Sequence, residues 1–222
     1  MNFVDGCKSI EEVKAVAIEL TKQGKGNPIF RDAWLLGFEL MLRVSDLREL
    51  RYDDVQGDHV SITQQKTGKV LRVRLTDTAK RIIAARAAAN PSHVYVLQFD
   101  SKRSTGKPLS RSKLHEEISH AGHKLGLNLS THSMRKSKPT IGYEDGADIA
   151  VISKALGHKS LASTLHYIGA TQAKVDNFAD KYSLGELYEI HQDLHHENDH
   201  AVGGGSCIAS TCRKDYDQQS NK

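Results

Sequence analysis

Residues 131–167 read THSMRKSKPTIGYEDGADIAVISKALGHKSLASTLHY, and this stretch decides how the whole chain is interpreted. Its apolar residues recur with helical spacing in three short pieces, so we expect helices over about 134–144, 148–156 and 161–167. Short polar strings lie within and between these pieces, and they include an arginine, two histidines and a tyrosine. These strings make the segment the first candidate for a functional site.

Upstream of this stretch the pattern alternates between helices and one β-hairpin. Residues 59–63 and 70–75 are rich in β-branched side chains and alternate in polarity, which is typical of strands. Residues 64–69 predict the tip of the hairpin, with Gly68 supplying the turn. Ser9 and Glu12 form a capping box that predicts a helix start. Helices are expected over about 9–22, 28–42 (after the cap Asn27), 46–51 (capped by Ser45), 77–89 and 110–125, with a further one over 172–181.

The charge divides the chain into a basic part and an acidic tail. Residues 186–222 carry a net charge of −4, so residues 1–185 carry +8. This excess favours a polyanionic partner such as nucleic acid, because each neutralised phosphate releases counterions. A soluble basic domain without such a partner is the alternative. We expect residues 1–185 to fold as one domain and residues 186–222 to form a flexible tail.

Several classes of protein are excluded by simple features. The N-terminus has no apolar core of a secretory signal, and no apolar run is long enough to span a bilayer. The three cysteines give no paired framework, which favours a reducing cytoplasm. The tail histidines are spaced irregularly in an acidic, glycine-rich setting, so a disordered segment is favoured over a zinc site; they are His191, His195, His196 and His200.

Three strings carry the functional prediction: LRVSDL at 42–47, THSMR at 131–135, and LGH at 156–158 followed by TLHY at 164–167. Here residues 10–182 resemble the catalytic domain of the tyrosine recombinase (phage integrase) family, with its motifs Leu-Arg-x-Ser-Glu/Asp-Leu, His-x-x-Arg, Leu-Gly-His and Thr-x-x-Tyr. The spacing agrees too, since His158 lies 23 residues beyond Arg135 and Tyr167 a further 9. Each string alone has an ordinary structural explanation, such as a helix-end cation or a glycine cap. Their joint order and spacing favours the family.

The resemblance implies a role for each polar residue of these strings. Arg43 and Arg135 clamp the non-bridging oxygens of a phosphodiester, whose negative charge grows during attack. Tyr167 is the nucleophile; its phenol has an ordinary pKa near 10 and needs a positive pocket and a proton acceptor. His132 is the general base or proton relay, and His158 donates a hydrogen bond to the phosphate.

The family's proton donor to the leaving oxygen is a lysine on a β-hairpin. Lys66 and Lys69 both stand at the predicted hairpin tip, and Lys66 is preferred because it lies 23 residues beyond Arg43. Two solvated lysines that only touch backbone phosphate are the alternative. Asp46 stands where the family has an acidic residue, as support for Arg43.

The resemblance also implies the fold and the reaction. The expected fold is α+β, a mainly helical catalytic domain with a small antiparallel sheet. The expected reaction is site-specific DNA recombination through a 3′-phosphotyrosyl intermediate, without cofactor or metal. The expected partners are double-stranded DNA, three further copies of the chain in a homotetramer on paired sites, and accessory DNA-bending proteins. A bacterial cytoplasm is the expected location, with the gene carried by the cell, a phage or a plasmid.

Two departures from the family pattern limit the resemblance. Arg43 lies so near the N-terminus that no separate N-terminal core-binding domain is expected, as in the small fimbrial phase-switch invertases. Lys138 and Pro139 follow Arg135 where relatives usually have a hydrophobic residue and Ala or Gly, so the helix should begin close to Arg135 or be kinked at the proline.

Two other functions remain open at this point. One is a DNA-binding recombination regulator without cleavage, although DNA binding alone needs neither Tyr167 nor His132. The other is a type IB topoisomerase or telomere resolvase that uses the same tyrosine chemistry.

Overall fold

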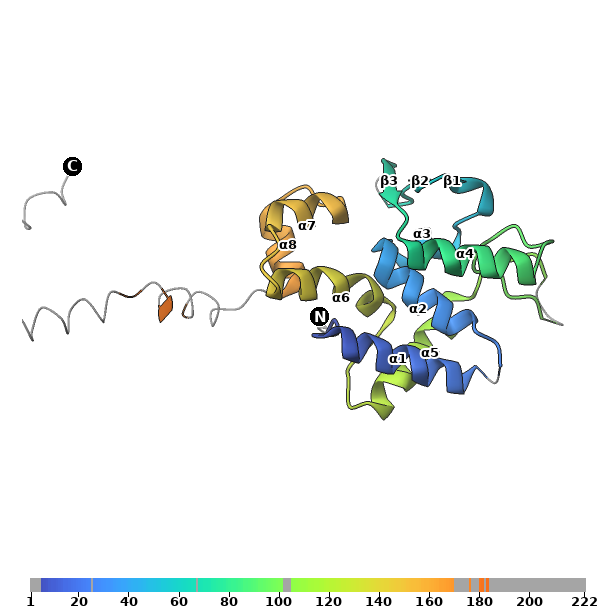
Figure 1. Cartoon of the computed structure of the whole chain (residues 1–222), viewed down its shortest axis with the longest axis horizontal. Coiled ribbons are helices and arrows are strands. Elements are labelled where there is room, and N and C mark those ends of the chain that lie inside the picture. Colours follow the sequence, from blue (N-terminus) through green and yellow to red (C-terminus); the bar gives the residue numbers. More distant parts are fainter. Residues whose placement is uncertain are drawn as a thin grey trace, which may run out of the picture. The chain divides into compact units, whose positions relative to one another are not determined.

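The structure is a computed structural model that describes residues 5–24, 26–66, 68–101, 105–169, 176, 180, 181 and 183. Residues 1–170 form one compact unit, separate from residues 171–222. Figure 1 shows this unit as a group of helices with a small sheet near α3 and α4. The helices are α1 (Ile10–Gln23), α2 (Ile29–Leu40), α3 (Val44–Arg48), α4 (Asp77–Ala89), α5 (Arg111–Lys124), α6 (Thr131–Glu144), α7 (Ile149–Leu156) and α8 (Leu161–Ile168). The expected mainly helical α+β fold is therefore confirmed.

The sheet has three antiparallel strands in the order β1-β2-β3. They are β1 (Val55–Gln56), β2 (His59–Thr63) and β3 (Val70–Arg74), and a 3-10 turn, η1 (Tyr52–Asp54), precedes them. The register pairs Val60 with Val73 and Ile62 with Leu71. Val60 and Ile62 are buried, whereas β3 has no fully buried residue, so one strand anchors the hairpin to the core. Strand β1 was not predicted, because two residues carry no periodicity.

Helix α2 is the centre of the unit and packs against α1, α3, α4, α5 and α6. It is apolar on most of its surface, and Trp34 is completely buried. The indole Nε1 of Trp34 donates to the carbonyl oxygen of Val13 at 3.0 Å, which ties α2 to α1. Gly37 gives α6 a close approach, because a Cβ atom at this position would lie 2.6 Å from the Cβ of Met134.

Two predicted helix starts are wrong. Helix α6 begins at Thr131 rather than near 134 or 135, because Ser130 caps it: its Oγ accepts from His132 N at 3.1 Å. Pro139 therefore lies in the interior of α6, and it has no N–H to donate to the carbonyl of Arg135 four residues earlier. Helix α3 begins at Val44 with Arg43 as its N-cap, whereas Ser45 was the predicted cap.

The remaining predicted elements agree with the structure to within about two residues. The helix predicted over 172–181, the stripe of Val175, Phe178 and Tyr182 on it, and the tail histidines lie outside the described residues. The domain end at residue 185 stays a prediction. Within the described part of the chain, no helix is both long and apolar enough to cross a membrane.

Candidate active site

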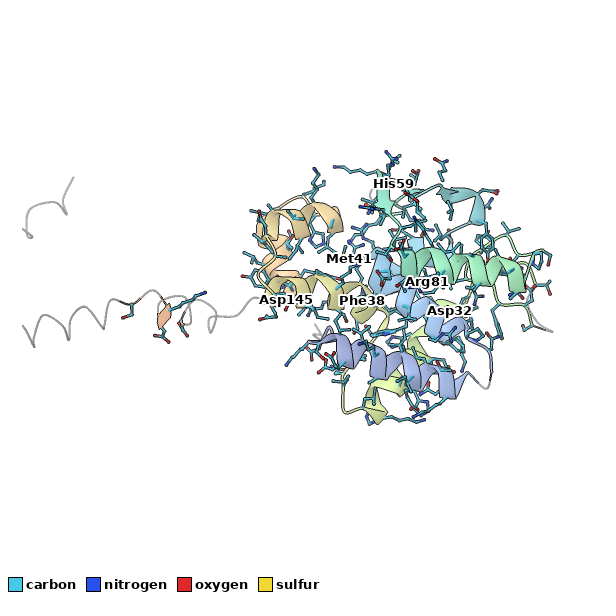
Figure 2. All side chains as sticks on the ribbon, viewed as in Figure 1. Asp32, Phe38, Met41, His59, Arg81 and Asp145 are labelled. Carbon is cyan, nitrogen blue, oxygen red and sulfur yellow. The ribbon has the colours of Figure 1, made fainter. Side chains whose placement is uncertain are left out.

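The site lies at the C-terminal end of α2, where the chain turns sharply into α3. Met41 ends α2 in the left-handed region, with φ 50° and ψ 30°. Figure 2 labels Met41 and Asp32, which lie toward opposite ends of α2. Two residues later, Arg43 is half-buried at the start of α3. Its Nη1 atom is buried without a hydrogen-bond partner in the described structure, so this donor is available to a ligand.

Arg135 projects from the second turn of α6 and is held by two backbone carbonyls. Its Nη1 donates to Met41 O at 2.7 Å and its Nη2 donates to Leu156 O at 2.6 Å. Each of these nitrogens carries a second N–H. Burial lowers the pKa of Arg135, and neighbouring Arg43 lowers it further, while Tyr167 and Asp46 act in the opposite direction. The guanidinium is thus buried, oriented and close to a second cation.

The Leu-Gly-His string forms the end of α7, and the glycine explains its geometry. Gly157 adopts a left-handed φ of 65°, and His158 N donates back to Ser153 O at 3.0 Å. This turn presents the carbonyl of Leu156 to Arg135. It also sets His158 at the edge of the site, where its ring meets the ring of Tyr167 edge-on at 5.3 Å between centroids.

Thr164 orients His158 from the neighbouring helix α8. Its Oγ1 lies 3.0 Å from His158 Nδ1 and 3.3 Å from Ser160 O, and the residue is fully buried. Burial lowers the pKa of His158, and Arg135 and Arg43 lower it further. The contact gives the threonine of the Thr-x-x-Tyr string a role that its spacing in the sequence does not reveal.

Tyr167 lies on α8 and directs its hydroxyl group toward the two arginines. Burial raises the pKa of the Tyr167 phenol, whereas Arg135 and then Arg43 counteract that rise. The hydroxyl oxygen is buried and has no hydrogen bond of regular geometry among the described residues. Because its pKa is raised, the phenol keeps its proton until a base removes it.

His132 is the second residue of α6 and is exposed. Partial burial lowers its pKa, and the cations Arg111 and Arg135 and the imidazole of His115 add to the effect. A neutral imidazole is favoured in these surroundings, which is the form that can accept a proton. Arg111 and His115 belong to α5 and had not been predicted near the site.

The two hairpin lysines are more exposed than the arginines and the tyrosine of the site. Lys66 is exposed at the tip of the β2–β3 hairpin and has no hydrogen bond or ion pair to another described residue. Lys69 is exposed as well, and its carbonyl oxygen accepts from Gln64 N at 2.9 Å. The structure thus groups Arg43, His132, Arg135, His158 and Tyr167 around one place, and leaves Lys66 at its margin.

Asp46 was predicted to support Arg43, and the structure shows a hydrogen bond between Asp46 and the hairpin. The carboxylate is buried, and its Oδ1 accepts from the backbone N–H of Gln65 at 3.1 Å. Its Oδ2 is buried without a partner in the described structure, as is Arg43 Nη1. Asp46 therefore connects α3 to the hairpin, and its negative charge acts to raise the pKa of Arg135.

The arrangement suits chemistry on a phosphodiester. Two guanidinium groups can supply planar donors, a phenol can supply a nucleophile, and two imidazoles can move or donate protons. Arg43 Nη1 and Tyr167 OH are both buried without a hydrogen bond of regular geometry in the described structure, and both lie close to Arg135, so these groups can act together on an anionic ligand.

Comparisons with known proteins agree with this arrangement. A model of the phage integrase family matches residues 22–174. The probable integrase/recombinase YoeC of Bacillus subtilis (strain 168) is 31% identical over 173 residues, which is 76% of this chain and 91% of YoeC. The tyrosine recombinase XerA of Thermococcus kodakarensis is 31% identical over 156 residues; the match covers 68% of this chain and 55% of XerA.

Solved structures show the same fold. The crystal structure of a XerA recombinase superposes with a TM-score of 0.62 at 19% identity, covering 82% of this chain and 65% of that one. A λ integrase dimer bound to a COC′ core site superposes with a TM-score of 0.59 at 18% identity, covering 76% of this chain and 49% of that one. The family match over most of the chain and the identity with YoeC decide the assignment, and the chain belongs to the phage integrase family.

Proposed function

We propose that this chain is a site-specific DNA recombinase that cuts and rejoins DNA through a covalent bond to Tyr167. The observation that carries the proposal is the convergence of the buried Tyr167 hydroxyl oxygen with two arginines, of which Arg43 has a buried nitrogen without a hydrogen-bond partner in the described structure. Such a site suits an anion that accepts hydrogen bonds from the arginines and reacts with the phenol. A DNA phosphodiester satisfies both requirements.

The reaction balances with the residues of the chain. The Tyr167 oxygen attacks phosphorus as His132 takes the phenolic proton, and a bond forms between phosphorus and the tyrosine oxygen. The bond to the 5′-oxygen breaks, and Lys66 gives that oxygen a proton. Arg43, Arg135 and His158 stabilise the charge on the non-bridging oxygens. A 5′-hydroxyl of the partner strand then reverses these steps, so the phosphodiester is restored without an energy source.

The larger assembly belongs to the proposal as well. One of the similar structures is a λ integrase tetramer bound to a Holliday junction, which supports four copies of this chain on two duplexes. Accessory DNA-bending proteins would assist a catalytic domain that spans residues 1–185. Docking of the predicted 172–181 helix on a neighbouring copy would connect the protomers.

Trapping of the covalent intermediate tests the function. DNA bound covalently to the chain in cells is recovered and sequenced, and a nicked substrate is built on the recovered site. Wild-type protein should form an adduct on this substrate, and Tyr167→Phe should bind the same DNA and form none. Tyr143→Phe is the matched control and should form the adduct normally.

Each other outcome identifies a different function. An adduct that persists in Tyr167→Phe moves the nucleophile to another tyrosine. DNA binding without any adduct in the wild type supports a recombination regulator. Relaxation of supercoiled plasmids that lack the recovered site supports a topoisomerase.

A further inference from the structure

The tip of the β2–β3 hairpin is closed by its own backbone, but Lys66 takes no part in that closure. Gln64 N donates to Lys69 O at 2.9 Å, and Gly68 N donates to Gln64 O at 2.8 Å. The Lys66 side chain is exposed and unpaired among the described residues. A three-stranded sheet with one two-residue strand is a weak support for a catalytic side chain. The position of Lys66 therefore depends on what holds the tip.

Gln65, the residue next to Lys66, connects the tip to the α3 segment through two hydrogen bonds. Its backbone N–H donates to Asp46 Oδ1 at 3.1 Å. Its side-chain amide Nε2 donates to Glu49 Oε2. Both acceptors are carboxylates, and hydrogen bonds to ionised acceptors are stronger than those between neutral groups. One residue of the hairpin is thus held at its backbone and at its side chain.

The acceptors stand on the same short helix that begins with a phosphate-binding arginine. Arg43 is the N-cap of α3, Asp46 lies within it and Glu49 is its C-cap. These residues are spaced by three, so consecutive ones are neighbours along the helix surface. Helix α3 therefore fixes the distance between the Arg43 guanidinium and the hairpin tip.

We propose that Gln65 is a positioning residue for the general acid: its hydrogen bonds to Asp46 and Glu49 hold Lys66 where the leaving 5′-oxygen of DNA departs. This inference rests on the proposed function and on the assignment of Lys66. A tip released from α3 samples other positions, and proton transfer is slowed because the lysine is in range for a smaller fraction of the time. Attack by Tyr167 is unaffected.

The test compares two leaving groups on the nicked substrate. An ordinary phosphodiester needs a proton on its 5′-oxygen, whereas a 5′-bridging phosphorothiolate leaves without one. Gln65→Ala and Glu49→Ala should each slow single-turnover cleavage of the ordinary substrate by roughly tenfold and leave the phosphorothiolate rate unchanged. The double variant should be no slower than either single one, because both remove the same hydrogen bond.

Two controls accompany these variants. Gln56→Ala removes an exposed glutamine from β1 of the same sheet and should change neither rate. Glu49→Gln keeps an oxygen acceptor for the Gln65 amide and should recover part of the lost rate. Equal slowing of both substrates by Gln65→Ala, or no slowing of either, overturns the proposal.

Different outcomes would contradict the role of Gln65, the assignment of Lys66 and the proposed function. Lys66→Ala should lose activity on the ordinary substrate and regain it on the phosphorothiolate. Rescue of Lys66→Ala without rescue of Gln65→Ala removes only the positioning role. Absence of rescue in Lys66→Ala overturns both the role of Lys66 and that of Gln65, while an adduct at Tyr167 would still support the recombinase. Absence of any adduct in the wild type overturns the proposed function and this inference together.

Discussion

The guanidinium group of Arg135 donates to the carbonyl oxygen of Met41 at 2.7 Å, and Met41 is the described non-glycine residue with a positive φ. The left-handed turn at Met41 does two things: it aims this carbonyl at Arg135 and it brings the chain round to Arg43. The backbone conformation of Met41 thus determines how the two proposed phosphate-binding arginines lie relative to each other. The conformation is unfavourable for a residue with a Cβ atom, by about 1–2 kcal/mol.

Replacement of Met41 by glycine and by alanine separates this backbone strain from the loss of the side chain. Both variants delete the side chain, but only glycine adopts φ 50° without strain. Glycine also gains freedom in the unfolded chain, which offsets part of the benefit. We expect Met41→Gly to have a free energy of unfolding about 1 kcal/mol higher than Met41→Ala, measured by urea denaturation. The reverse order would mean that the residue does not occupy the left-handed region in solution.

The close contact between α2 and α6 predicts that a single methyl group added at Gly37 destabilises the protein. A Cβ at Gly37 would lie 2.6 Å from Met134 Cβ, so Gly37→Ala forces α2 away from α6, the helix that carries Arg135. We expect a loss of about 1–3 kcal/mol of stability, together with slower cleavage because Arg135 moves.

Gly142, which lies in helix α6, provides the control for Gly37 of α2. A Cβ at Gly142 meets only Ala147 Cβ, at 3.8 Å. Gly142→Ala should therefore stabilise the protein by about 0.5–1 kcal/mol through the helix preference of alanine. If Gly37→Ala raises the free energy of unfolding as Gly142→Ala does, helices α2 and α6 do not approach each other at Gly37 as closely as the structure shows.

The buried ion pair between Asp32 and Arg86 joins α2 to α4 away from the active site. Arg86 Nη1 lies 3.0 Å from Asp32 Oδ2, and Arg86 Nε donates to Val96 O at 2.6 Å. Arg86→Met removes the partner of Asp32 Oδ2 and leaves the Val96 carbonyl unpaired, whereas Arg31 still pairs with Asp32 Oδ1 at 2.8 Å, so we expect a loss of about 1–3 kcal/mol of unfolding free energy. Lys80→Met removes one member of the exposed pair with Asp58 and should cost far less, because water solvates both charges. Similar losses in the two variants would contradict the burial of the Asp32–Arg86 pair.

Local signals in the sequence predicted most of the elements. The Ser9 cap, the alternating strands and the glycine turn of the hairpin depend on neighbours in sequence, and the structure has each of them. The start of α6 was missed because its cap pairs Ser130 with Ser133, whereas a capping box usually has Glu or Gln at the third helical position.

The site was predictable only as far as its motif residues. The order and spacing of the strings identified the arginines, histidines and tyrosine. They did not reveal that the carbonyls of Met41 and Leu156 hold Arg135, since any residue type supplies a carbonyl. They also did not reveal the contact of Gln65 with Glu49, which joins residues 16 positions apart through the fold of the hairpin.

The contact of Thr164 with His158 predicts a loss of activity without a loss of DNA binding. Thr164→Val keeps the shape of the side chain but removes the hydroxyl group that lies 3.0 Å from His158 Nδ1. The imidazole then loses the partner that fixes its orientation and tautomer. By analogy with groups that orient metal ligands, we expect cleavage to fall by about 10–100-fold with unchanged DNA affinity. Thr164→Ser, which retains the hydroxyl, should be far more active than Thr164→Val; equal activities would exclude this role.

The lowered pKa of His158 predicts that stability falls in mild acid. Burial and the cations Arg135 and Arg43 make the charged imidazole less favourable in the folded protein than in the unfolded chain. The unfolded chain therefore takes up a proton first as the pH falls through the ordinary histidine range near 6.5. The resulting stability is fully present above that range and decreases as the pH falls toward the depressed folded value.

The comparison of unfolding at two pH values isolates this contribution. We expect the free energy of unfolding of the wild type to be lower at pH 5 than at pH 7, and His158→Gln to reduce that difference because glutamine does not titrate. His120→Gln removes an exposed imidazole from the middle of α5 and serves as the control. It should retain the full difference. If His158→Gln and His120→Gln give the same pH dependence, the His158 imidazole is not held beside the two arginines.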